Sequence, residues 1–257
     1  MSRSTIIFMN AFSRIKTYSL CFALTLPVFA AGPALVVDRG LAQANLNNAS
    51  GGYRSNVRWS LYDSGFLGDD FAVGAAGESW VIDTIRVWTV PGVNAKDPEH
   101  LGDFYQDVRL YFGGANESLT PIVTGLLKPG GNESSNPNIL ISDATVAGAA
   151  RYDDFGTDMR VWQIDFTRLN LAVEGGAKVR FGAFGLGRPR PDAAGKTYAW
   201  FNAATNAELA LAKQDGADGA MLLFTSGGKF KSAFDGKGAG WDKSSDINVQ
   251  VFAHRAN

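Results

Sequence analysis

Apolar and polar residues alternate along several stretches of the chain. In VRWSLY (57–62), Val57, Trp59 and Leu61 fall on one side of an extended backbone, and the more polar residues fall on the other. Because strand side chains repeat with a period of two, this stretch predicts an antiparallel strand with one buried and one more polar face. The same pattern recurs at 107–112, 160–166, 178–184 and 246–253.

Stretches rich in Gly, Pro, Asn and Asp separate these predicted strands, as in KPGGNESSNPN (128–138) and DGKGAGWDKSSD (235–246). Each is short enough to be a loop between strands rather than a linker between domains. Helical spacing occurs in NAELALAKQDG (206–216), which predicts one short helix near 205–213. The whole pattern therefore predicts an all-β fold, a two-sheet antiparallel sandwich of jelly-roll type, and excludes a long alternation of strands and helices.

The stretch ESWVIDTIRVW changes the side on which its apolar residues fall. Trp80 and Ile82 share one parity, whereas Ile85 and Val87 share the other. All four can face one core only if an extra residue is inserted between the two pairs. We therefore expect a β-bulge near Asp83–Thr84.

The first residues have the layout of a secretory signal peptide. Basic residues precede the apolar run YSLCFALTLPVFAAGPALVV, and small residues follow at the end of the apolar core. Cleavage fits after Ala30 or after Ala44, so we predict a leader within 1–44 and a single domain over 45–257. A retained membrane anchor is the alternative, but Pro and Gly interrupt the run, and we expect no membrane span once the leader is removed.

Composition indicates the cellular compartment and the classes of partner. The one cysteine, Cys21, lies inside the leader, so the mature protein has no disulfide, which in an exported protein is typical of bacteria. The formal net charge of the chain is −1, and the mature protein is more acidic because the leader is basic. This balance lacks the basic surface of a nucleic-acid binder, so we expect no nucleic-acid partner.

One segment carries a resemblance to known proteins. DDFAV (69–73), a short Gly-rich turn and the strand ESWVIDTIRVW (78–88) resemble the opening of a class of exported bacterial β-sandwich domains of uncharacterised function. The resemblance implies the fold and the export, and it supplies no activity. The chain ends in VFAHRAN without a C-terminal anchoring segment, so we expect a freely secreted protein, extracellular or periplasmic.

Asp69 and Asp70 form the most conspicuous pair of acids in the chain. Neighbouring strand residues point to opposite faces, so the two carboxylates cannot act together as the acid pair of a glycosidase. An inward Asp69 needs hydrogen bonds from backbone amides or an arginine, and we favour that structural role. The alternative is that one of the two works with a distant acid such as Glu78, Asp165 or Glu174.

Other catalytic chemistry finds little support. The chain has two histidines, His100 and His254, and no G-x-S-x-G motif or mature cysteine, so we expect a binding function rather than an enzyme. Loop carboxylates can hold calcium, which prefers oxygen ligands, and a solvated loop is the alternative. The acids in such loops are Asp153, Asp154 and Asp158, which we take as the candidate calcium site, and the group Asp235, Asp242 and Asp246. We expect no other cofactor.

Arginine and aromatic residues give the best functional clue. Arg86 and Trp88 stand at the end of one predicted strand, Arg109 and Tyr111 stand in the next, and Trp241 lies in a Gly-rich loop. If these strands pair, the four strand residues form one outward patch that suits the C–H face and hydroxyls of a sugar. The alternative is that a second layer of the structure buries the rings.

Together these features predict a secreted, non-catalytic domain that binds an extracellular glycan or cell-envelope component through Arg86, Trp88, Arg109, Tyr111 and Trp241. Two alternatives remain open at this point. One is a carboxylate-dependent polysaccharide hydrolase or lyase on the same fold, and the other is a structural or matrix protein. Sandwich folds host many unrelated activities, so the choice depends on the site.

Overall fold

The fold was obtained as a computed structural model. It describes residues 32–40, 55–60, 66–91, 100–114, 120–144, 152–154, 157–159, 161–205, 222–224, 230–232 and 246–256. At 55–60, 90–91, 152–154, 157–159, 204–205, 223–224 and 230–232 the description covers the backbone only. The chain from Ala31 onward forms one compact unit.

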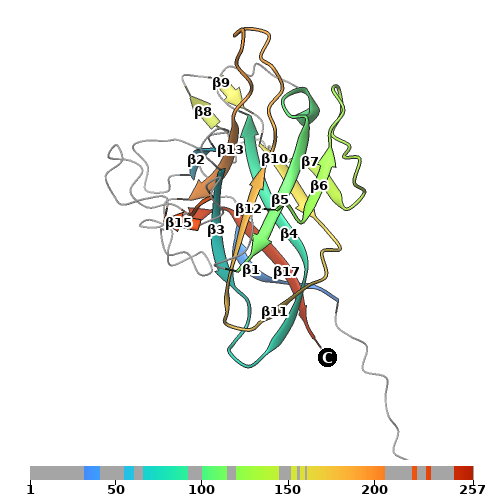
Figure 1. Cartoon of the computed structure of the whole chain (residues 1–257), viewed down its shortest axis with the longest axis vertical. Coiled ribbons are helices and arrows are strands. Elements are labelled where there is room, and N and C mark those ends of the chain that lie inside the picture. Colours follow the sequence, from blue (N-terminus) through green and yellow to red (C-terminus); the bar gives the residue numbers. More distant parts are fainter. Residues whose placement is uncertain are drawn as a thin grey trace, which may run out of the picture. The chain divides into compact units, whose positions relative to one another are not determined.

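The larger of two sheets is built around one long central strand (Figure 1). Its main path runs β1 (Ala34–Arg39), β17 (Val249–Arg255), β4 (Ser79–Pro91), β10 (Trp162–Phe166) and β7 (Ile139–Asp143). Two further strands also pair with β4, namely β11 (Leu171–Glu174) and β13 (Trp200–Thr205). β13 in turn pairs with β2 (Ser55–Ser60) and β16 (Asp246–Ile247). Every pairing is antiparallel.

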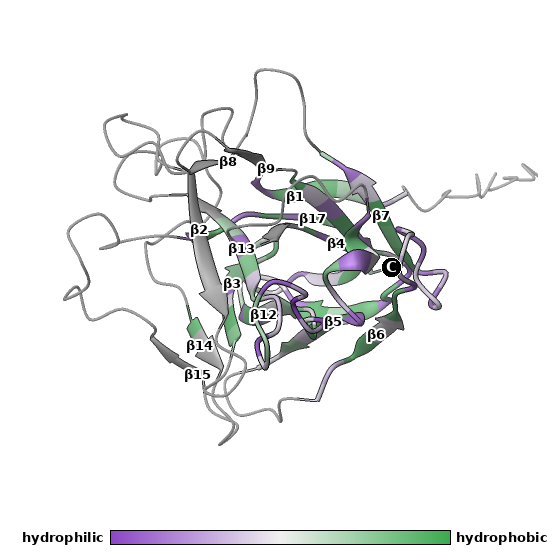
Figure 2. Cartoon of the chain, turned by 90° about the horizontal axis from the view of Figure 1, so that it is seen from above, coloured by the Kyte–Doolittle hydropathy of each residue, from purple (hydrophilic) through white to green (hydrophobic). Residues whose placement is uncertain are grey.

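The second sheet has six strands in the described part of the chain. Their order is β15 (Phe230–Ser232), β14 (Leu222–Phe224), β3 (Phe66–Ala72), β12 (Lys178–Phe184), β5 (Asp107–Gly113) and β6 (Val123–Leu126). Two short strands, β8 (Tyr152–Asp154) and β9 (Thr157–Met159), form a separate hairpin, and a short 3₁₀ helix spans Leu101–Asp103. The two sheets pack against each other in an antiparallel sandwich, seen as two layers in Figure 2, which confirms the predicted fold class.

Strand β10 shows how the alternating pattern fills the core. Trp162, Ile164 and Phe166 are fully buried, whereas Gln163 and Asp165 between them are partly exposed. The apolar residues face the other sheet because burial of large side chains is the main stabilising contribution to such a fold. The strands predicted at 107–112, 160–166 and 178–184 are present as β5, β10 and β12 within two residues of the expected bounds, whereas the stretch predicted at 246–253 divides at Asn248 into β16 and β17.

The predicted β-bulge lies in β4. Phe252 of β17 pairs with Thr84 and Ala253 pairs with Ile82, so Asp83 is the extra residue on β4. On either side of this bulge, Ile82 and Ile85 are both fully buried. The insertion therefore returns both halves of the strand to the same core, as their parity requires.

Two boundaries and the membrane prediction can be compared with the structure. Strand β1 precedes position 45, where the domain was predicted to begin, so the sandwich also includes residues from Ala34. The helix predicted near 205–213 falls outside the described residues, except that Thr205 ends β13. In the described part of the chain, no helix has the length and apolar character that a membrane crossing requires.

Candidate functional site

The residues predicted to form one arginine–aromatic patch lie on two different sheets. Arg86 and Trp88 belong to β4 of the nine-stranded sheet, and Arg109 and Tyr111 belong to β5 of the six-stranded sheet. The expectation that these two strands pair is wrong, because β5 pairs with β6 and β12 instead. Trp241 lies outside the described residues. The structure therefore brings Arg109 and Tyr111 together and separates them from Arg86 and Trp88.

Arg86 is part of a polar row on the outward face of the nine-stranded sheet. Its Nε and Nη2 donate to the two carboxylate oxygens of Asp165 at 2.7 and 2.8 Å, and its Nη1 donates to Gln250 at 3.2 Å. Gln250 donates to Asp38 at 2.9 Å. The hydrogen bond to Asp165 holds the pKa of Arg86 above its usual range. These four residues occupy directly paired positions on β1, β17, β4 and β10.

Trp88 is buried. It shares the outward parity of Arg86, since Val87 between them faces the core, yet the Trp88 side chain is only 5% exposed. Sequence parity predicted an exposed ring at this position, and the structure shows the alternative, in which the ring is covered. Parity assigns a residue to one face of a sheet, but it does not say what packs over that face.

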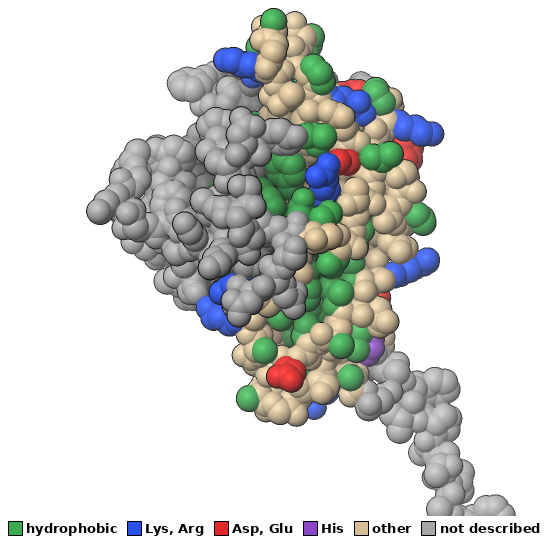
Figure 3. All heavy atoms as spheres, viewed as in Figure 1, with side chains coloured by type: hydrophobic (Ala, Val, Ile, Leu, Met, Phe, Trp, Pro, Cys, Tyr) green, Lys and Arg blue, Asp and Glu red, His purple; other side chains and the backbone are tan. Residues whose placement is uncertain are grey.

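Three aromatic rings occupy the outward face of the six-stranded sheet. Tyr111 pairs across the sheet with Gly182, and its ring centroid lies 4.2 Å from that of Phe66. Phe66 lies 5.9 Å from Phe184. All three have the opposite parity to core residues of their own strands such as Leu110, yet like Trp88 they are buried, at 7–8% exposed, and belong to the hydrophobic core cluster. Figure 3 views this side of the molecule and shows hydrophobic side chains gathered over it, with a basic and an acidic side chain in contact beside them.

Arg109 lies next to these rings on β5. Its Nη2 and Nε donate to Asp107 at 2.6 and 3.1 Å, and the Arg109 side chain is 30% exposed while that of Asp107 is 6% exposed. Burial disfavours the charge of Arg109, but hydrogen bonds with Asp107 and Tyr111 outweigh this effect and raise its pKa. Asp107 also accepts a hydrogen bond from the backbone N–H of Leu186 at 3.1 Å.

We call Phe66, Tyr111, Phe184, Arg109 and Asp107 the aromatic face. Arg109 and Tyr111 were predicted from the sequence, whereas Phe66 and Phe184 were not. The sequence contained a signal for Phe66. Phe66 and Asp70 are an even number of residues apart on one strand, so Phe66 falls on the side opposite to the inward Asp69. Of its five residues only Arg109, at 30% exposed, is appreciably accessible, and it is held by the carboxylate of Asp107 beside the buried rings.

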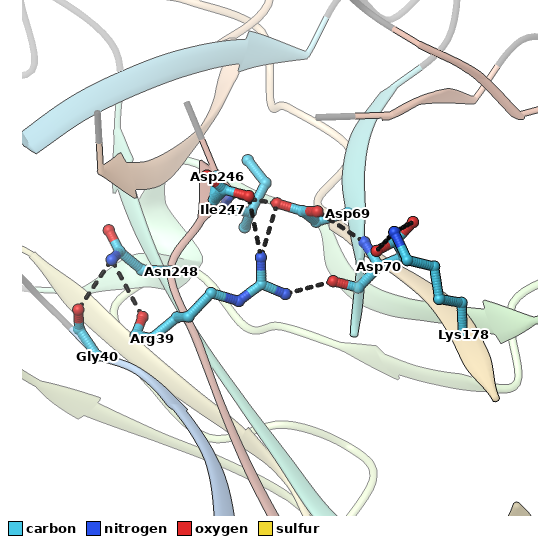
Figure 4. A network of polar contacts seen from close by, with 8 residues as sticks. All are labelled: Arg39, Gly40, Asp69, Asp70, Lys178, Asp246, Ile247 and Asn248. Carbon is cyan, nitrogen blue, oxygen red and sulfur yellow. Dashed lines mark hydrogen bonds and ion pairs between the residues drawn. The ribbon is translucent and has the colours of Figure 1, made fainter. Parts of the chain in front are cut away.

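A second polar cluster lies in the interior, between the two sheets (Figure 4). Nη1 of Arg39 on β1 is 3.3 Å from Oδ2 of Asp69 on β3 and 3.3 Å from Oδ1 of Asp246 on β16. The three side chains are at most 1% exposed. Arg39 also donates through Nη2 to the backbone carbonyl of Asp70. We call Arg39, Asp69 and Asp246 the buried cluster.

Asp69 has the partners that its predicted inward position required. Its Oδ1 accepts from the N–H of Asp70 and its Oδ2 from the N–H of Ile247, both at 2.7 Å. Burial raises the pKa of Asp69 to about 7, an effect that Asp246 adds to and that Arg39 and the two amides oppose. Asp70 points to the other side, toward Lys178 at 3.3 Å. The two adjacent acids therefore face in opposite directions, as predicted.

The buried cluster does not have the geometry of an open catalytic site. Asp69 and Asp246 are two acids from different strands that share one arginine, but each is 1% exposed and enclosed by the sandwich. Of the distant acids considered as partners, Glu78 accepts hydrogen bonds from the Ala75 N–H and the Trp80 indole, both at 2.9 Å. Asp165 is held by Arg86. In the described structure these acids serve as partners of donors and cations.

For the three predicted calcium ligands the structure describes the backbone but not the side chains. Asp153 and Asp158 pair directly across the β8–β9 hairpin, and Asp154 pairs with Thr157, but their side chains lie outside the described part of the chain. Elsewhere, among the residues whose side chains are described, no three or more His, Cys, Asp or Glu are grouped to hold a metal ion. Asp246 of the other acidic loop is buried beside Arg39 rather than exposed in a loop.

No protein-family model, curated protein or solved structure matches the chain.

Proposed function

We propose that this chain is an exported, non-catalytic domain that binds an extracellular glycan or another cell-envelope polymer through its aromatic face. The observation that supports the proposal is the grouping of Phe66, Tyr111 and Phe184, buried rings at outward-parity positions of one sheet, beside the partly exposed Arg109.

The contrast between the two outward faces supports this assignment. Antiparallel sandwiches usually present polar side chains on the faces that point away from the core. The nine-stranded sheet follows this rule with its row of Asp38, Gln250, Arg86 and Asp165, in which each group is bonded to its neighbour. The six-stranded sheet carries the Asp70–Lys178 ion pair on its outward face, but aromatic rings occupy the outward-parity positions of Phe66, Tyr111 and Phe184.

The chemistry of the aromatic face suits a carbohydrate. A sugar presents C–H groups on the faces of its ring and hydroxyls at its rim, so it binds to a flat apolar surface that is bordered by a few polar groups. Arg109 is 30% exposed and supplies a donor, and the buried rings of Tyr111 and Phe66 and the buried acceptor Asp107 lie beside it. Arg109 is the most exposed of these residues and is the group that a ligand meets first.

Neither alternative function has an observation of comparable weight. A polysaccharide hydrolase or lyase needs two acids that reach a substrate, and the facing acids of the buried cluster are enclosed. A structural or matrix protein needs a surface for self-association. That alternative predicts a concentration-dependent mass in solution without glycan binding.

A matched pair of variants tests the proposal. The mature protein is screened against immobilised glycans and cell-wall polymers, and binding is then measured by calorimetry for Arg109→Ala and Arg86→Ala. Both arginines are ion-paired on outward sheet faces, but they lie on different sheets. Loss of a charged hydrogen bond to the ligand weakens binding about tenfold or more in Arg109→Ala and leaves Arg86→Ala unchanged. The proposal fails if no polymer binds or if the two variants lose affinity equally.

A further inference from the structure

Strand β1 is an integral part of the sandwich although it lies close to the predicted leader. Val37 pairs with Val251 and Arg39 pairs with Val249, so β1 covers the edge of β17 with backbone hydrogen bonds. Val37 is 2% exposed and belongs to the hydrophobic core. β17 in turn lies beside the central strand β4. Without β1, the backbone of β17 becomes an unpaired sheet edge.

Arg39 is the only cation of the buried cluster, as far as the described side chains show. Asp69 and Asp246 both lie 3.3 Å from its Nη1 and are otherwise enclosed. Loss of the cation from a buried ion pair is strongly unfavourable, and removal of Arg39 takes this shared cation from both acids at once. The cluster therefore ties β1 to β3 of the opposite sheet and to β16.

The backbone that follows β1 is also held in place. The side-chain amide of Asn248 donates to the carbonyl of Arg39 at 3.1 Å and to that of Gly40 at 2.8 Å (Figure 4). Asn248 is fully buried, so loss of these carbonyls costs it two partners in the interior. Contacts with the rest of the fold thus continue through Gly40, the last residue before an undescribed segment.

We propose that the leader is removed ahead of Ala34, at the Ala30 position, and that β1 stays in the mature protein. Cleavage after Ala44 removes β1, the Arg39 cation of the buried cluster and the two carbonyls to which the Asn248 side-chain amide donates. Cleavage after Ala30 leaves all of them in place. This inference rests on the export that the proposed function includes, but it does not depend on glycan binding.

The intact mass of the exported protein tests the position directly. The full chain is expressed in a bacterial host, and the protein recovered from the periplasm or medium is weighed by mass spectrometry. A mass that corresponds to a start at Ala31 is expected. A start at Asn45, or an uncleaved chain, overturns the proposal. A protein that binds no glycan still reports its N-terminus, so failure of the proposed function is distinguishable.

Purified proteins that begin at Ala31 and at Asn45 give an independent test. The longer protein is expected to unfold in one cooperative urea transition, and the shorter one to lose that transition or to shift its midpoint far toward low urea. Addition of a peptide of residues 31–44 to the shorter protein is expected to restore part of the transition. Equal midpoints for the two proteins overturn the proposal, because β1 is then dispensable.

Discussion

Arg39 and Asp69 meet in the interior of the sandwich, where Nη1 of the arginine is 3.3 Å from Oδ2 of the aspartate. They come from β1 and β3, which belong to different sheets. Because Asp246 shares the same guanidinium, the cluster holds two acids and one base away from water. Such an arrangement contributes less to net stability than apolar packing of the same volume, but it is intolerant of the loss of one member.

The pKa of Asp69 predicts an unusual pH dependence of stability. Its pKa is raised from 3.8 to about 7 in the folded protein, so the folded state holds a proton that the unfolded state has already released. The stabilisation from this group is therefore complete below pH 4, falls as the pH rises toward 7 and is absent above it. Urea unfolding from pH 4 to 8 measures the effect as a difference between wild type and Asp69→Asn.

Asp70→Asn is the matched control for that experiment. Asp70 is adjacent in sequence but faces outward toward Lys178. The wild type and Asp70→Asn are expected to lose stability in parallel between pH 4 and 7, whereas Asp69→Asn is expected to lose less. Identical slopes for all three proteins would show that Asp69 does not carry the proton.

Replacement of Arg39 by methionine is predicted to be strongly destabilising. The change keeps much of the apolar volume but leaves Asp69 and Asp246 without their shared cation, and breaking a buried pair in this way costs about 3–5 kcal/mol. The pKa of Asp69 rises further in this variant, because Arg39 is the largest influence that lowers it. The free energy of unfolding from urea titrations measures the loss.

Lys178→Met provides the comparison for Arg39→Met. Lys178 also pairs with an aspartate, Asp70, but the lysine side chain is 64% exposed. An exposed ion pair contributes about 0–1 kcal/mol, so this variant should remain close to wild type. Similar losses in the two methionine variants would mean that burial of the charges does not determine their effect.

Local pattern predicted a large part of this fold. The alternation at 160–166 identified β10 and its core residues, since the period of two follows directly from strand geometry. The parity change around Asp83 located the bulge for the same reason. The inward position of Asp69 and its need for amides and an arginine were also correct.

The rest depended on contacts between distant parts of the chain. The sequence around Arg39 also alternates, with Val37 at the same parity, but the adjacent apolar run made it appear to be part of a leader. The separation of Arg86 from Arg109 follows from which strands pair, and periodicity within a strand contains no information on its neighbours. Likewise, Trp88 is buried by packing that parity does not reveal.

Deletion of Asp83 is predicted to prevent correct folding. Without the extra residue, every side chain in the part of β4 before the bulge points to the opposite face of the sheet. Ile82 then points outward instead of into the core. Asp83→Ala keeps the residue count and removes only the side chain, which accepts a hydrogen bond from Thr84 at 2.7 Å. Near-ultraviolet circular dichroism and urea unfolding should show a native signal for Asp83→Ala and its loss for the deletion. A cooperative transition at the same midpoint in both would contradict the bulge.

The interaction between Arg86 and Asp165 is predicted to contribute only modestly to the free energy of unfolding, although the ion pair is bidentate. The side chains are 27% and 14% exposed, so solvent screens the pair, and a double-mutant cycle should give a coupling of about 0.5–1 kcal/mol. Unfolding free energies of Arg86→Ala, Asp165→Ala and the double variant measure this coupling. It should decrease at high salt because the pair is partly exposed. A coupling of zero, or one that is unaffected by salt, would rule out this ionic contribution.

Gly102→Ala is predicted to destabilise the end of the sandwich near the 3₁₀ helix. A Cβ at Gly102 would lie 2.0 Å from the carbonyl oxygen of Lys128 and 2.6 Å from that of Gly131, and backbone atoms cannot yield as a flexible side chain can. The N–H of Gly102 donates to that Gly131 carbonyl at 3.0 Å, so the strain acts on a hydrogen-bonded contact. Gly32→Ala is the control, since nothing lies within 4 Å of the added Cβ. Thermal unfolding should show a lower midpoint for Gly102→Ala and no change for Gly32→Ala, and equal midpoints would exclude the close approach.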